Sequence, residues 1–139
     1  MKKVKFPEPE PGFILLGVVS SERDYRLCFQ INKTGLLHLS KTDAIKIPVA
    51  DECIMTFNRF GPTTDEGAEN AVYLVNNRQE GHLLFPNFKN LDYVLVINGP
   101  GKKEKAAELK AGLTSIPSIQ AIFALEVDKL KSKNYLYLD

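Results

Sequence analysis

Residues 82–101 have the sequence H-L-L-F-P-N-F-K-N-L-D-Y-V-L-V-I-N-G-P-G, and the apolar residues of the chain are most concentrated here. Within this stretch, Tyr93 to Ile97 is a continuous run of aromatic, β-branched and leucine side chains, closed by Asn98-Gly99-Pro100-Gly101. An uninterrupted apolar run of this length, ended by turn residues, is typical of a strand covered on both faces. The sequence therefore predicts a central strand at 92–98, with the rest of the chain packed around it.

The predicted fold class is α+β, with a largely antiparallel sheet of five or six strands and two main helices packed on it. Alternating or continuous apolar runs bounded by turn residues place the strands at 13–19, 53–60, 71–77, 81–85, 92–98 and 119–126. Helix start and stop signals place the helices at 21–34 and 103–114. A ferredoxin-like arrangement is the alternative topology.

Two segments give ambiguous signals. The interior of 21–34 alternates as a strand would, but serines precede it and Gly35 follows it, which favours a helix over a hairpin onto 13–19. In 36–49, Thr42-Asp43 could cap a single helical turn before Pro48. Segments 71–75 and 82–85 are expected to form a hairpin, and the strand, helix and strand after residue 92 a crossover unit.

Length and composition predict one domain, 12–139, after a flexible Pro/Glu arm at 1–11. With 18 basic and 17 acidic side chains interspersed, no strong field draws the chain to nucleic acid or anionic lipid. It has no long uncharged apolar run, so we expect no membrane segment and a cytoplasmic location. Cys28 and Cys53 fit reduced, buried thiols, and His38 and His82 have unrelated spacings, so neither a metal nor a cofactor is predicted.

Residues 85–93, F-P-N-F-K-N-L-D-Y, resemble the signature that names the IPExxxVDY family of bacterial proteins. Pro86, Asp92 and Tyr93 match, Phe85 and Leu91 occupy the aliphatic positions, and asparagine at 87 replaces the family's glutamate. The segments 24–29 and 131–136 are similar to the family's pattern as well, so the resemblance spans 13–138. It supports the helix at 21–34 but brings no function and no catalytic residues.

Two places could carry chemistry. Asp92 and Tyr93 begin the central strand, where we expect Asp92 to fix the preceding corner and Tyr93 to pack, rather than to act in acid–base catalysis. Gly99, Gly101, Lys102 and Lys103 lie between a strand and a helix, a position where helix N–H groups can bind an anion. The spacing does not match a nucleotide P-loop, so a simple turn is the favoured interpretation.

The C-terminal segment 134–139, N-Y-L-Y-L-D, alternates tyrosine and leucine. Such a strand either packs on its own domain or pairs with a second copy, which makes a homodimer or a protein partner possible. Because no catalytic constellation is visible, the first functional hypothesis is a non-catalytic interaction or self-association domain. The alternative is a small-molecule or anion-binding protein, conceivably an enzyme, that uses the 98–103 loop or a cleft beside Asp92.

Overall fold

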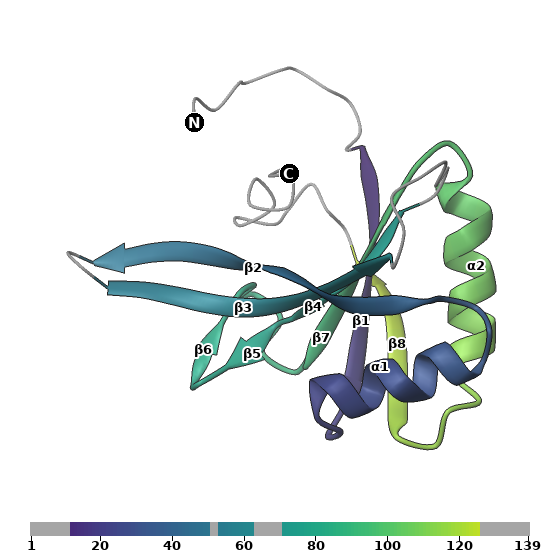
Figure 1. Ribbon diagram of the computed structural model, residues 1–139, viewed down its shortest axis with the longest axis horizontal. Coiled ribbons are helices and arrows are strands. Elements are labelled where there is room, and N and C mark those ends of the chain that lie inside the picture. The colour runs from purple at the N-terminus through teal and green to yellow at the C-terminus, as the bar shows by residue number, and fades with distance from the viewer. Residues whose placement is uncertain (1–11, 51–52, 63–70, 126–139) are drawn as a thin grey trace.

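The computed structural model describes residues 12–50, 53–62 and 71–125. Six strands form one antiparallel sheet in the order β2-β3-β4-β7-β1-β8, and β5 and β6 form a separate two-stranded ribbon (Figure 1). This confirms the predicted α+β class. In chain order the elements are β1 (Phe13–Ser20), α1 (Asp24–Lys33), β2 (Leu39–Ala50), β3 (Cys53–Pro62), β4 (Val72–Asn76), β5 (Arg78–Gln79), β6 (His82–Leu83), β7 (Tyr93–Asn98), α2 (Lys102–Leu113) and β8 (Ile119–Leu125).

The connectivity corresponds to the alternative topology. Elements β1, α1, β4, β7, α2 and β8 follow one another as β-α-β-β-α-β, and their strands lie side by side in the order β4-β7-β1-β8. All neighbouring pairs are antiparallel, as in a ferredoxin-like arrangement. The hairpin of β2 and β3 is inserted between α1 and β4, and α2 makes the predicted crossover from β7 to β8, with β1 between these two strands.

Strand β7 is the central strand that the sequence predicts. It pairs with β4 on one side and β1 on the other, and its residues from Tyr93 to Ile97 are all buried. Because side chains alternate between the faces of a strand, Leu95 and Ile97 point to one hydrophobic cluster, and Val94 and Val96 to another. Burial on both faces is the physical reason for a continuous apolar run.

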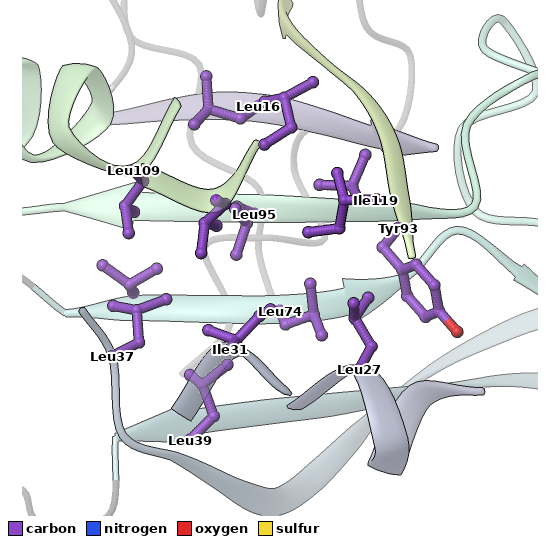
Figure 2. Packing of buried hydrophobic residues seen from close by; sticks show 14 of the residues in the cluster. Leu16, Leu27, Ile31, Leu37, Leu39, Leu74, Tyr93, Leu95, Leu109 and Ile119 are labelled. Atoms are coloured by element: carbon purple, nitrogen blue, oxygen red, sulfur yellow. The ribbon is translucent and has the colours of Figure 1, made fainter. Parts of the chain in front are cut away.

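The first hydrophobic cluster lies between the sheet and the two helices. Figure 2 shows Leu27 and Ile31 of α1 and Leu109 of α2 facing the leucines of the sheet. These three side chains are at most 1% exposed. Burying a leucine or isoleucine is worth about 1.5–3 kcal/mol, so both helices are held mainly by this apolar face.

The second cluster lies on the opposite face of the sheet, where no helix of the described residues packs. It is covered by Ile45 and Ile47 of β2 and Phe57 of β3, together with Leu84 and Phe85 of the loop after β6. The β2–β3 hairpin pairs with β4 through only two residue pairs near its base, and its far part extends past the other strands (Figure 1). The β2–β3 hairpin and the loop after β6 therefore cover this face of the sheet.

The expected helical turn in 36–49 is wrong, because residues 39–50 form the twelve-residue strand β2. From Thr42 to Ile45, β2 advances by three residues while its partner β3 advances by two, from Arg59 to Phe57. This extra residue in β2 is a β-bulge. The bulge hides the alternation that would reveal a strand. Pro48 is tolerated because β2 is an edge strand, where a missing N–H need not break a ladder.

The expected strand at 81–85 is also wrong as a member of the main sheet. Only His82 and Leu83 are in strand conformation, and they pair with β5 rather than with β4. A tight turn with positive φ at Glu80 and Gly81 reverses the chain there. The apolar side chains of Leu84 and Phe85 are buried by the second cluster instead of by strand pairing.

The segment 21–34 is a helix, which rejects the hairpin alternative. Helix α1 begins at Asp24, three residues later than predicted, and its N-cap residue Arg23 makes no side-chain capping bond. The predicted C-terminal signals are confirmed, since Lys33 is in the last turn and Gly35 has a φ of 82°. The arm at 1–11, the tail at 134–139 and the side chain of Cys53 lie outside the described residues.

Candidate functional site

A polar network joins the first turn of α1 to the middle of β3 and to the ends of β4 and β5. Asp24 Oδ2 accepts hydrogen bonds from Asn58 Nδ2 at 2.9 Å and from Asn76 Nδ2 at 3.1 Å. Gln79 Oε1 accepts from Asn76 Nδ2 at 3.1 Å and from the backbone N–H of Asn58 at 2.8 Å. A carboxylate at a helix N-terminus also interacts favourably with the helix dipole. The network therefore fixes where α1 begins, in place of the missing N-cap bond.

Asn76 is the buried centre of this network. Asn76 is only 6% exposed, and its side-chain Oδ1 has no hydrogen-bond partner among the described residues. The amide cannot simply be flipped, because Nδ2 already donates to two acceptors that would repel an oxygen. One internal water molecule is the smallest group that would satisfy Oδ1.

Tyr93 and Cys28 lie next to the network and are held in their neutral forms. The Tyr93 hydroxyl donates to the carbonyl oxygen of Glu22 at 2.5 Å, and in Figure 2 it points out of the hydrophobic cluster. Burial, followed by the nearby Asp24 and Asp92 carboxylates, raises the pKa of Tyr93 well above its usual value. Burial and then Asp24 raise the pKa of the Cys28 thiol to about 12. Neither group is poised to give up a proton near neutral pH.

Asp92 has a structural role, but its carboxylate reaches the preceding corner only through Arg78. Its Oδ2 accepts from the backbone N–H of Ser20 at 2.9 Å, which joins the end of β1 to the entry of β7. Its Oδ1 lies 3.4 Å from Arg78 Nε, and Arg78 Nη2 donates to the carbonyl oxygen of Lys89 in the preceding corner. A carboxylate occupied in this way ties three segments together.

Asn77 holds the same corner and was not among the predicted site residues. It is fully buried, and its Nδ2 donates to the carbonyl oxygens of Phe88 at 3.0 Å and Leu91 at 2.8 Å. Its Oδ1 accepts from the backbone N–H of Phe85 at 2.8 Å. The sequence places Asn77 in a polar run typical of an exposed loop, so only the three-dimensional contacts reveal its role.

The remaining residues of the 85–93 motif are structural as well. Pro86 is exposed at the corner, whereas Leu91 is buried and lies directly over Gly17 of β1. A Cβ atom on residue 17 would be 2.4 Å from Leu91 Cδ1, so any side chain at this position would displace the buried Leu91 side chain.

The 99–103 loop lies at the start of α2, as predicted. Gly99 has a φ of 109°, a conformation that favours glycine, and its carbonyl oxygen accepts from Lys102 N–H at 3.2 Å. The Gly101 carbonyl oxygen accepts from Lys105 N–H at 3.0 Å, and Lys103 is exposed. This geometry accounts for Gly99 through the turn, whereas Gly101 has a φ of −98° that any residue can adopt, and anion binding stays a prediction.

Other candidates for chemistry are scattered. His38 and His82 are both exposed and lie in different parts of the fold, ahead of β2 and at the start of β6. Within residues 12–50, 53–62 and 71–125, no group of three or more histidine, cysteine, aspartate or glutamate side chains could hold a metal ion. In the same residues, no helix is long and apolar enough to cross a membrane.

The two edges of the main sheet differ sharply in chemistry. The β2 edge carries Lys41, Asp43, Lys46 and Pro48 and is interrupted by register shifts. Charges, proline and bulges are the features by which proteins protect an edge from further pairing. The β8 edge, I-Q-A-I-F-A-L at 119–125, has no charge and no proline, and its Phe123 is 50% exposed. We therefore take the β8 edge as the candidate functional site.

Helix α1 adds a second exposed apolar feature. Tyr25 and Phe29, one turn apart, are 58% and 64% exposed, and Lys33 Nζ lies 5.5 Å from the centre of the Phe29 ring. The ammonium group covers part of one ring face.

No family model, curated protein or solved structure matches this chain.

Proposed function

We propose that this chain is a non-catalytic interaction domain that self-associates by pairing the β8 strands of two copies. The contrast between the two sheet edges carries the proposal. A strand at the end of a sheet presents unpaired N–H and C=O groups, and an edge without charge or proline accepts another strand most readily. Strand β8 has β1 on one side and, among the described residues, no strand on the other.

A second copy of the chain fits this edge because β8 is compatible with itself. In a twofold dimer every residue meets its equivalent or a near neighbour, so a charged edge would place like charges together. An antiparallel pair centred on Ile122, the middle residue of β8, would set Ala121 opposite Phe123 and Gln120 opposite Ala124. The two exposed Phe123 rings would then lie close to the symmetry axis and shield each other from water.

The resemblance of residues 85–93 to the IPExxxVDY family remains compatible with this proposal, since it assigns no activity. The buried positions of Leu91, Tyr93 and Cys28 and the occupied hydrogen bonds of Asp92 support a structural role for the motif. We therefore propose that the motif stabilises the fold of the domain, and that the β8 edge on the surface of the domain performs the function.

Sedimentation equilibrium tests the proposal with a matched pair of variants. F123K adds charge to the β8 edge, and S40K adds the same charge at an exposed position of the β2 edge. The wild type and S40K should form dimers of equal affinity, whereas F123K should raise the dimer Kd by at least about tenfold, equivalent to about 1.4 kcal/mol. Thermal unfolding verifies that both variants are folded.

A wild-type chain that stays monomeric up to about millimolar concentrations would refute self-association. A dimer that S40K and F123K weaken equally would show that general charge, and not the β8 edge, controls association.

A further inference from the structure

The chain does not end where β8 ends. Strand β8 finishes at Leu125, and fourteen more residues, 126–139, follow it directly. Any strand formed by this segment would therefore start close to β8, which is an edge strand of the sheet among the described residues. The occupant of the β8 edge can therefore come from the same chain as well as from a second copy.

The side chains of β8 define what such a strand must offer. Ile122 belongs to the cluster under the helices, and Leu125 packs on the cluster of the opposite face. Alternation then places Ala124 on the helix face and Phe123 on the opposite face. A partner strand should present aliphatic groups toward the helices and an aromatic ring toward Phe123, because aromatic cross-strand pairs stabilise sheets.

The last residues of the chain have this pattern. Residues 134–138 are N-Y-L-Y-L, with both tyrosines on one side of an extended strand and both leucines on the other. The connection at 126–133 has eight residues and three lysines. Eight residues are enough for a chain to reverse its direction, and lysine side chains favour contact with water.

Proximity favours the strand of the same chain. A segment of the same chain, separated from β8 by only eight residues, has an effective concentration in the millimolar range, which a second copy in dilute solution does not reach. We propose that residues 134–138 add to the β8 edge of their own chain as a further antiparallel strand and thereby compete with a second copy. This competition rests on the proposed self-association through the β8 edge. The C-terminal segment would then set the concentration at which the domain dimerises.

The full-length double variant L136P/Y137P tests this inference. Consecutive residues of a strand direct their N–H groups to opposite sides, so two successive prolines remove one bond to β8 in any register. The control K131P/S132P places the same pair of prolines in the connection. Hydrogen exchange of the β8 amides at a concentration where the chain is monomeric, and sedimentation equilibrium at higher concentrations, are measured for both variants and the wild type.

We expect β8 amides to exchange at least about tenfold faster in L136P/Y137P than in the wild type, and its dimer Kd to fall by a similar factor. The control should match the wild type in both measurements. Unchanged β8 exchange would overturn the inference, as would a weaker dimer in L136P/Y137P, which would show that the segment contributes to the dimer. If F123K still disrupts a dimer in either case, the proposed function survives alone. If no variant dimerises but β8 exchange accelerates, self-association and the competition both fail, and only the added strand remains supported.

Discussion

Asn77 shows how one buried amide can organise a loop. Its side chain satisfies two carbonyl oxygens and one N–H group of the corner at 85–91, none of which has a strand partner for that bond. Water cannot replace these bonds easily, because the residue is 0% exposed. The corner is followed directly by Asp92 and Tyr93, so its conformation positions the start of β7. The position of the central strand therefore depends on a residue outside the family-like motif.

We predict that N77A lowers the free energy of unfolding by about 2–4 kcal/mol, because it leaves the Phe85 N–H and the Leu91 carbonyl oxygen without the partner that Asn77 provides and removes one of the two bonds to the Phe88 carbonyl oxygen. Urea denaturation monitored by circular dichroism measures the change. The control is N90A, an exposed asparagine in the same corner, which should change stability by less than about 0.5 kcal/mol. Equal stability of the two variants would contradict the role assigned to Asn77.

Cys28 makes stability depend on alkaline pH. Its pKa is raised from 9.0 to about 12 by folding, so the unfolded chain releases the thiol proton first. The stability that this group contributes is complete below about pH 9 and is lost as pH rises toward the folded value, at up to about 1.4 kcal/mol per pH unit. Tyr93, whose pKa is also raised by burial, adds a further loss above about pH 10.

We therefore expect the free energy of unfolding of the wild type to fall between about pH 8 and pH 11, with a shallower fall in C28A. C28A itself is less stable at neutral pH because it opens a small cavity, so the slopes are compared and not the values. Urea denaturation at several pH values gives both slopes. Parallel slopes would mean that Cys28 ionises equally in the folded and unfolded chains.

At the scale of elements, the bulge in β2 decides which side of the sheet the hairpin covers. Before the bulge, Leu39 packs on the cluster under the helices; after it, Ile45 and Ile47 pack on the opposite cluster. All three positions are odd-numbered, so an unbroken strand would direct them to one face. The extra residue between Thr42 and Ile45 reverses the alternation.

Deleting Ala44 removes this extra residue. Ile45 then lies five residues after Leu39 instead of six, so an unbroken strand still directs these two side chains to opposite faces. We predict that Ile45 and Ile47 stay buried in the deletion variant, and that its free energy of unfolding falls by less than about 1 kcal/mol. Differential scanning calorimetry measures the change. The substitution A44S keeps the length of β2 and should remain close to the wild type. A deletion variant less stable than A44S by about 3 kcal/mol or more would show that the two isoleucines lose their burial without the bulge.

At the scale of the whole molecule, local patterns predicted those elements whose signals are complete within a short window. Strands β1 and β7 are continuous apolar runs buried on both faces, and α2 has an apolar stripe, so each was placed within about two residues of its position. Strand β2 was missed because its bulge and Pro48 break the alternation. Leu84 and Phe85 were misassigned because burial by a loop and burial by a strand leave the same apolar run.

The candidate site was less predictable than the elements that form it. The composition of 119–125 is visible in the sequence, but its position at the end of the sheet follows from the pairing of β8 with β1, more than one hundred residues earlier. Likewise, Asp24, Asn58 and Asn76 come together only through the fold. Contacts between residues so far apart in the chain depend on the order of the strands, which local propensity does not encode.

The pairing of β1 also bears on how the protein is made. This strand is synthesised before the other described elements, yet both of its neighbours, β7 and β8, come more than seventy residues later. At about 5–20 residues per second, a ribosome needs several seconds to reach them after β1 has been synthesised. During that interval Phe13–Ser20, a strongly apolar segment, has no native partner to cover its edges. Nascent chains of this protein are therefore expected to depend on holding chaperones until β7 and β8 have been synthesised.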